Sequence, residues 1–216
     1  MRLVFLGAPG VGKGTQAALL SVEWTLPHIA TGNLLRAAVA QRTAVGLEVQ
    51  SCIQAGRLVA DDLITRVTRE RLQQSDAAGG YILDGFPRTI GQAEALSKML
   101  SEQHHQLDRV VYFDLRHEVL VDRISGRRSC PACQKVYHLR YDPPRVGLLC
   151  TCGTPVVQRP DDVPETVKTR LDVYQRETEP LIAYYQNQGI LRQIDVDMGI
   201  SDVTRQVRDA VDGPLG

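Results

Sequence analysis

Short apolar runs alternate along the chain with longer stretches in which apolar residues recur every three or four positions. The apolar runs, which predict buried strands, are residues 3–6, 28–30, 81–83, 110–113 and 190–194. Helical periods cover residues 14–23, 33–40, 46–55, 63–74, 89–100, 118–126 and 201–211, and a longer one covers 164–187. Strands that alternate with helices are typical of an α/β fold. We therefore predict a parallel five-stranded sheet flanked by helices, with the longest helix broken at Pro180, which cannot donate an interior helical hydrogen bond.

Two segments stand outside this alternation. The first has a helical pattern and no strand, whereas the second is rich in cysteine, proline and arginine. In the second segment, residues 136–139 and 155–157 have the apolar pattern of short antiparallel strands. We expect three parts, which are a helical insertion (31–60), a small β lobe (127–158) and a core made of residues 1–30, 61–126 and 159–216.

A glycine-rich loop lies between the first predicted strand and the first predicted helix. Its sequence, residues 7–15, is Gly-Ala-Pro-Gly-Val-Gly-Lys-Gly-Thr. Glycines let successive backbone N–H groups point inward at phosphate oxygens, and the following helix adds its N-terminal partial positive charge. The loop departs by one position from the G-x-x-x-x-G-K-[ST] pattern, because Gly14 precedes Thr15. We predict a P-loop NTPase fold in which Lys13 bridges phosphates and Mg²⁺ accompanies the nucleotide.

The third predicted strand ends in a carboxylate, Asp84, which is followed by Gly-Phe-Pro-Arg. P-loop enzymes hold Mg²⁺ through an aspartate at the end of a strand. The sharp turn presents Arg88 at the carboxyl edge of the sheet, where ligands of open α/β sheets bind. Together with the glycine-rich loop, this motif indicates a site for phosphoryl groups.

The overall composition is that of an ordinary globular protein. Of 216 residues, 43% are apolar, and 25 basic residues balance 25 acidic ones. A nucleic-acid-binding protein usually has a basic excess, and no apolar run approaches the about 20 residues that span a bilayer. The first apolar run continues into Gly12 and Lys13 and not into a cleavage site. We expect a cytoplasmic monomer that binds neither nucleic acid nor membrane.

The predicted β lobe combines a local basic excess with a cluster of cysteines. Residues 126–159 carry six basic residues and one acid, which indicates either a solvated face or a surface that meets a polyanionic small molecule. Cys52 stands alone, and the remaining cysteines are Cys130, Cys133, Cys150 and Cys152. An odd number, clustered in one stretch, favours a metal site over a disulfide framework. Four thiolates suit tetrahedral, structural Zn²⁺, although the second pair is spaced as C-x-C.

These motifs resemble those of adenylate kinases, which transfer a phosphoryl group between ATP and AMP. The resemblance covers essentially the whole chain. It rests on the glycine-rich loop (7–15), Thr-Gly-Asn-Leu-Leu-Arg (31–36), Asp-Gly-Phe-Pro-Arg (84–88) and Gly-Arg-Arg (126–128). The cysteine-bearing lobe is similar to the zinc-containing lid of many bacterial members. The resemblance implies that residues 31–60 bind the nucleoside monophosphate, that residues 127–158 form the lid, and that ATP, AMP and ADP are the partners.

The resemblance also implies roles for individual residues. ATP would be bound by Gly10, Val11, Gly12, Lys13, Gly14, Thr15, Arg123, Arg127, Val136, Tyr137 and Met198. AMP would be bound by Thr31, Arg36, Arg57, Leu58, Val59, Gly85, Phe86, Pro87, Arg88, Gln92, Arg159 and Arg170. The charged groups at the chemical step would be Lys13, Asp84, Arg88, Arg123, Arg127, Arg159 and Arg170. Cations suit this step, because the migrating group carries heavy negative charge and needs little covalent help.

Two positions depart from the family pattern. Asn33 stands where aspartate is common, so one charge near Mg²⁺ is removed while an oxygen that can accept hydrogen bonds is kept. Met198 falls where a polar contact to ATP is common.

Other functions are compatible with parts of the pattern. A kinase for UMP, CMP or another nucleoside monophosphate shares the motifs, and Thr31 and Gln92 favour adenine. A zinc-ribbon ATPase that binds nucleic acid would use the basic lobe, against which the zero net charge and 5% aromatic content argue. A non-catalytic nucleotide-binding module would not need so many arginines.

Overall fold

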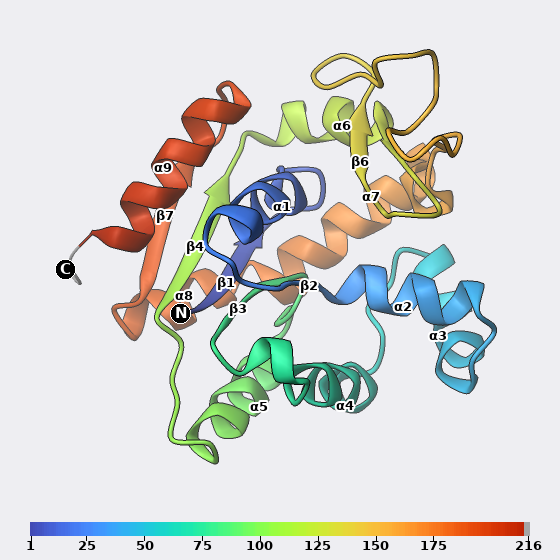
Figure 1. Ribbon diagram of the computed structural model, residues 1–216. Coiled ribbons are helices and arrows are strands. Elements are labelled where there is room, and N and C mark those ends of the chain that lie inside the picture. Colours follow the sequence, from blue (N-terminus) through green and yellow to red (C-terminus); the bar gives the residue numbers. More distant parts are fainter. Residues whose placement is uncertain (214–216) are drawn as a thin grey trace.

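A parallel sheet forms the centre of the computed structural model, which describes residues 1–213 (Figure 1). The strands are β1 (Arg2–Gly7), β2 (His28–Ala30), β3 (Tyr81–Asp84), β4 (Arg109–Asp114) and β7 (Leu191–Asp195), in the order β2-β3-β1-β4-β7. All four pairings between them are parallel. The predicted five-stranded parallel sheet is confirmed, including the position of each strand.

Both faces of the sheet are covered by helices, which explains why β1 is apolar throughout. Leu3 and Phe5 pack into one apolar cluster, and Val4 and Leu6 into another, as the two-residue period of a strand requires. The first face is covered by α1 (Lys13–Glu23), α6 (His117–Ser125), α7 (Pro164–Val173) and α9 (Ile200–Asp212). The second is covered by α4 (Asp61–Leu72), α5 (Ile90–Ser101) and α8 (Leu181–Asn187), and α2 (Thr31–Ala40) and α3 (Ala44–Gln54) extend the same apolar cluster beyond the edge of the sheet (Figure 1).

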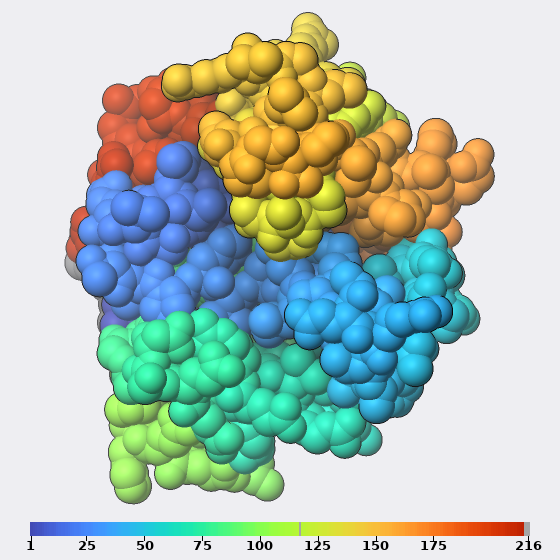
Figure 2. Space-filling model, turned by 45° about the vertical axis from the view of Figure 1, so that its right-hand side comes forward, coloured from blue at the N-terminus to red at the C-terminus, as the bar shows by residue number. Residues whose placement is uncertain are grey.

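The segment 31–60 forms helices and no strand, as predicted. Helices α2 and α3 pack so closely that a Cβ at Gly46 would collide with the backbone of Ala38. Glycine at this position therefore permits the contact. Thr43 caps α3 by accepting a hydrogen bond from Gly46 N at 3.1 Å. In Figure 2 this blue segment lies below the yellow and orange lobe, on the same face of the molecule.

The lobe contains a two-stranded antiparallel sheet, but its partner strand is not the predicted one. β6 (Val136–His138) pairs with β5 (Arg127–Ser129), whereas residues 155–157 make only isolated bridges. One reason is that Pro155 has no N–H to donate to a ladder. Val157 still exchanges two hydrogen bonds with Ser129, at 2.8 and 2.9 Å. The segment 155–157 therefore closes the lobe without forming a regular strand.

The long helical stretch 164–187 is broken at Pro180, as predicted, but it also contains a π-helical segment that the sequence did not indicate. Between α7 and α8, residues Tyr174–Thr178 are π-helical, and Glu179 N donates to Tyr174 O at 2.9 Å. Such segments are often found near functional sites. Here the segment directs the Thr178 hydroxyl to Arg88 O, at 2.9 Å.

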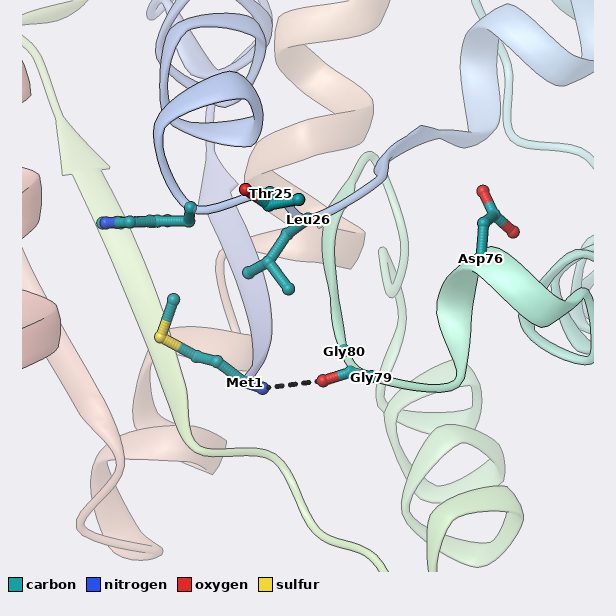
Figure 3. A pocket seen from close by; sticks show the side chains of 7 residues that line it. Met1, Thr25, Leu26, Asp76, Gly79 and Gly80 are labelled. Atoms are coloured by element: carbon teal, nitrogen blue, oxygen red, sulfur yellow. Dashed lines mark hydrogen bonds between the residues drawn. The ribbon is translucent and has the colours of Figure 1, made fainter.

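A cavity of about 440 Å³ opens at the amino edge of the sheet (Figure 3). It is lined by Met1, Trp24, Thr25, Leu26, Asp76, Gly79 and Gly80. The terminal amine donates to Gly79 O at 3.1 Å, and a Cβ at Gly80 would collide with the backbone of Met1. This cavity lies at the opposite end of β1 from the glycine-rich loop. None of the helices within residues 1–213 is long and apolar enough to cross a bilayer.

Candidate active site

The glycine-rich loop follows the carboxyl end of β1 and leads into α1. Gly7, Gly10 and Gly12 adopt φ values of 145°, 83° and 106°, a region that L side chains rarely occupy. A Cβ at Gly10 would in addition collide with Ile124 of α6. The loop therefore requires glycine at these positions for its backbone path.

Lys13 lies over the loop as its first helical residue. Its Nζ donates to Gly7 O at 2.7 Å and to Ala8 O at 2.9 Å. Burial lowers the pKa of Lys13 to about 8, although the nearby charge of Asp84 opposes this shift. Burial therefore makes the charged form of this amine less favourable than in water, and an anion in the loop would stabilise its charge.

The departure at Gly14 has a steric explanation. A Cβ at this position would lie 3.2 Å from Asp84 Oδ2, a tighter contact than most side chains accept. Glycine therefore allows the end of β3 to approach the start of α1 closely. This contact brings the two motifs identified in the sequence together.

Asp84 is ionised in an interior position. Burial alone would raise its pKa, but the hydrogen bond from His28 and the charge of Lys13 outweigh burial and lower the pKa to about 2. The contact between His28 Nε2 and Asp84 Oδ2 measures 3.3 Å. The sequence analysis did not single out His28, which lies at the start of β2. A fixed carboxylate at a strand end suits Mg²⁺, which prefers oxygen ligands.

The turn after Asp84 is held by hydrogen bonds to one carbonyl. Gly85 O accepts from Thr31 Oγ1 and from Arg88 Nε, both at 2.9 Å. Gly85 has φ 83°, and the Phe86-Pro87 peptide is cis. This shared acceptor places the side chains of Thr31 and Arg88, two of the predicted AMP residues, next to each other. Phe86 is buried and supports the turn from below.

Two adjacent carboxylates hold the arginines that enter from the lobe and from α7. Arg127 donates to Asp162 through two nitrogens, one of them Nε at 2.8 Å. Arg170 Nη1 lies 2.8 Å from Asp162 Oδ1 and 2.9 Å from Asp161 Oδ2. Asp162 is fully buried. Both of its oxygens accept from arginine, so this buried side chain has partners on both sides.

Six positively charged side chains lie close enough to shift one another's pKa values. They are Lys13, Arg36, Arg88, Arg127, Arg159 and Arg170. Burial lowers the pKa of Arg36, and the charges of Arg127 and Arg170 lower it further. Burial likewise lowers the pKa of Arg159, and neighbouring Arg36 and Arg127 add to this effect. Like charges packed in this way are stabilised by a polyanion between them. The cluster connects the glycine-rich loop, the insertion, the turn after β3, the lobe and α7.

Asn33 lies on the first turn of α2 and faces one of these cations. Its Oδ1 accepts from Arg36 Nη2 at 2.5 Å. Gly32 leaves room for this guanidinium to lie against the start of α2, because a Cβ there would lie 3.2 Å from Arg36 Nη1. The oxygen that replaces the family's usual carboxylate therefore orients an arginine.

Other predicted residues lie outside the cluster. Arg123 Nη2 donates to Val196 O at 3.0 Å, and its guanidinium lies 5.8 Å from the centre of the Tyr141 ring. Arg57 is exposed, Leu58 and Val59 are half-buried, and Met198 Sδ accepts from Gln206 Nε2 at 3.3 Å. Val136 is half-buried, whereas Tyr137 is buried inside the lobe. Nucleotide contacts by these residues remain predictions.

The four clustered cysteines converge in the lobe, where their sulfur atoms all lie within 4.8 Å of one another. Cys130 and Cys152 are 3.5 Å apart, and Cys133 and Cys150 are 3.4 Å apart. Tyr137 Oη donates to Cys150 Sγ at 3.3 Å. The backbone N–H of Cys152 is the main cause that lowers the pKa of Cys150 to about 5, and the Tyr137 hydroxyl adds to it. The C-x-C spacing therefore does not prevent convergence.

Sequence reasoning missed the acidic partners of the site. Asp161 and Asp162 follow Arg159 and Pro160, at the start of a stretch rich in acids, which was the available signal. Asp61 was also missed, and it accepts from Gln92 Nε2 at 2.7 Å. Each of these groups acts by holding another predicted residue.

This fold and this set of charged groups define a P-loop enzyme that transfers phosphoryl groups. The sequence profile of the family described as adenylate kinase matches residues 5–190. An adenylate kinase of Clostridium acetobutylicum is 42% identical over 212 residues, which cover 98% of this chain and 99% of the relative. One from Clostridium beijerinckii is 44% identical over 208 residues, or 96% of each chain. The chain belongs to the adenylate kinase family and is a phosphotransferase. The resemblance inferred from the motifs is confirmed.

Proposed function

We propose that this enzyme transfers a phosphoryl group reversibly between Mg-ATP and AMP to give two ADP. The observation that carries the proposal is the cluster of six cations beside the glycine-rich loop and the turn after β3, of which Arg159 is buried and the others are half-buried. Asp84, Asp161 and Asp162 offset three of these six positive charges. A single phosphate group would not balance the remaining three. Two nucleotides placed end to end, with their phosphates meeting at the cluster, supply the required negative charge.

On the donor side, residues 10–15 bind the phosphates of ATP through backbone N–H groups and Lys13. Arg127 approaches from the lobe, and Arg123 lies on the neighbouring α6. Val136, Tyr137 and Met198 are the proposed contacts of the nucleoside. Asp84 would hold Mg²⁺, directly or through water. When bound, Mg²⁺ would neutralise charge on the donor phosphates.

On the acceptor side, Thr31, Arg36 and residues 57–59 bind AMP from the insertion. Residues 85–88 and Gln92 bind it from the core. Arg159 and Arg170 face the phosphates that are exchanged. Arginine suits these positions because its planar fork grips phosphate through two hydrogen bonds. No general base is needed, because the accepting phosphate oxygen is already anionic near neutral pH.

The insertion (31–60) and the lobe (127–158) are the proposed moving parts around the core. ATP can lose its terminal phosphate to water, so the site should close only when the acceptor is bound. Both segments contribute cations to the cluster, which links closure to the completion of the site.

Conversion of ADP alone tests the reaction and separates it from the alternative, a kinase for UMP or CMP. With Mg²⁺ and ADP as the only nucleotide, the enzyme is expected to form ATP and AMP in equal amounts. This follows because ADP would occupy both nucleotide positions. Chromatography of the nucleotides measures it, and absence of both products in a folded sample would contradict the proposal.

Zinc in the lobe is also proposed. Zn–S distances of about 2.3 Å place tetrahedral ligands roughly 3.8 Å apart, and the sulfur atoms here lie 3.4 to 4.8 Å from one another. Cys130, Cys133, Cys150 and Cys152 would close the coordination sphere, so the ion would cross-link the lobe and perform no chemistry. The five cysteines are free thiols, which suits the proposed cytoplasmic compartment. A monomer is proposed as the working unit.

Elemental analysis of protein purified without chelator is expected to give about one zinc per chain if all four thiolates bind it. Cys150→Ser should destabilise the lobe before the core. Cys52 lies outside the cluster, so Cys52→Ser is the matched control and should keep the zinc. Metal-free protein with all cluster thiols freely titratable would exclude the zinc site and leave the kinase proposal intact.

A further inference from the structure

Gln92 is buried and its side-chain amide has partners on both sides. Its Nε2 donates to Asp61 Oδ1 at 2.7 Å, and its Oε1 accepts from Arg88 N at 2.7 Å. A carboxylate can only accept and a backbone N–H can only donate. The orientation of this amide is therefore determined, since the flipped amide would lose both hydrogen bonds.

Asp61 is itself held in place. Its second oxygen, Oδ2, accepts from Thr89 Oγ1 at 2.7 Å, and Thr89 is the residue that caps α5. Gly91 allows the approach, because a Cβ there would lie 3.3 Å from Asp61 Oδ2. Asp61 is also the first residue of α4, where the helix dipole favours a negative charge.

Within residues 1–213, the fixed amide keeps one donor and one acceptor without a partner. Each amide nitrogen carries two hydrogens and each amide oxygen has two lone pairs, and the protein uses one of each. Adenine presents an amino donor at C6 beside a ring nitrogen that accepts, a pair that the amide of glutamine can match. Guanine has a carbonyl oxygen at C6 and would require the flipped amide.

We propose that Asp61 is a specificity-determining positioning residue, which orients the Gln92 amide and thereby selects acceptors with an amino group over those with a carbonyl at C6. The inference rests on the proposed function, because it takes Gln92 to contact the acceptor base. Asp61 does not touch the nucleotide in this account. It acts through Gln92 and links the start of α4 to the start of α5.

Steady-state kinetics of Asp61→Ala with AMP and GMP tests the inference. Loss of one charged hydrogen bond is worth on the order of tenfold, so KM for AMP should rise about tenfold while kcat and KM for ATP change little. The AMP to GMP ratio of kcat/KM should fall by about the same factor, because the amide can now flip.

Asp62→Ala is the matched control. Asp62 is the next residue of α4 and is exposed, and within residues 1–213 its side chain makes no hydrogen bond or ion pair. The Asp62→Ala variant removes a negative charge from the same helix turn and should keep the wild-type AMP to GMP ratio of kcat/KM. Asp61→Asn, which keeps the shape of the side chain, should lower the ratio by a smaller factor, because two facing amides can flip together.

The coupling between the two residues gives a second readout. In a Gln92→Ala background, Asp61→Ala should cause no further loss of selectivity, whereas independent effects would add. An unchanged ratio in both Asp61 variants, or an equal loss in Asp62→Ala, would overturn the inference. A wild-type enzyme that fails to phosphorylate AMP would instead overturn the proposed function, and this is seen before any variant is made.

Discussion

Replacement of Lys13 or Arg88 by alanine is expected to lower kcat/KM by about 100-fold or more, because each change removes a cation that faces charge developing on the transferred group. Lys13 is held by two carbonyl oxygens of its own loop, and Arg88 is held by Gly85 O. Both therefore lie at fixed points between the proposed nucleotide positions. Steady-state kinetics with Mg-ATP and AMP measures the effect.

Lys98→Ala and Arg66→Ala are the matched controls, since both residues are exposed on helices away from the cluster. They should retain wild-type kinetics. Thermal unfolding of all four variants shows whether the fold is kept. A loss below roughly tenfold in folded Lys13→Ala or Arg88→Ala would show that the phosphoryl group is transferred elsewhere.

Asp162→Ala is expected to destabilise the protein by about 3–5 kcal/mol, because it removes the carboxylate that pairs with both Arg127 and Arg170 and leaves Asp161 alone to pair with Arg170. Asp162 is fully buried and accepts from both Arg127 and Arg170. The two guanidinium groups would then repel each other and lose their positions at the proposed phosphate site. Activity should therefore fall together with stability.

Denaturant unfolding measures this change in the free energy of unfolding. Asp172→Ala is the control, since Asp172 lies on the same helix as Arg170 and is exposed. Its effect should stay within about 0.5 kcal/mol. A similarly small effect for Asp162→Ala would mean that the buried ion pairs do not hold the site together.

Local patterns were sufficient to predict the sheet and the motifs. The apolar runs predicted the inner strands because a parallel strand that is covered on both faces is apolar throughout. The edge strand β7, Leu-Arg-Gln-Ile-Asp, is only partly buried and was predicted from its two apolar positions and its place in the alternation. The glycine-rich loop and Asp-Gly-Phe-Pro-Arg could be recognised because their chemistry depends on neighbours in sequence. The cysteine pairs were recognisable for the same reason.

The partners of the site residues could not be predicted from local patterns, because each pair is distant in sequence. His28 and Asp84 are 56 residues apart, Arg127 and Asp162 are 35 apart, and Asp61 and Gln92 are 31 apart. These contacts arise only when strands and helices assemble. The same is true of β5, whose basic sequence Arg-Arg-Ser has no apolar pattern. Pairing with β6 and with Val157 makes it a strand.

The π-helical segment before Pro180 also depends on its surroundings. Helical periodicity is continuous through residues 174–178, so the sequence predicts an ordinary helix there. A π-helical hydrogen bond spans five residues instead of four. In this conformation the Thr178 hydroxyl reaches the carbonyl of Arg88. The π-helical conformation therefore goes with a contact to the turn after β3, since the local sequence favours an ordinary helix there.

The choice of acceptor tests the central claim most directly. The measurement is the rate of phosphoryl transfer from Mg-ATP to AMP, CMP, UMP and GMP under identical conditions. If Thr31, Arg36, Arg88 and Gln92 form the acceptor position as proposed, AMP should be phosphorylated with by far the highest kcat/KM. Equal or higher kcat/KM with CMP, UMP or GMP would contradict the assignment of this site to AMP.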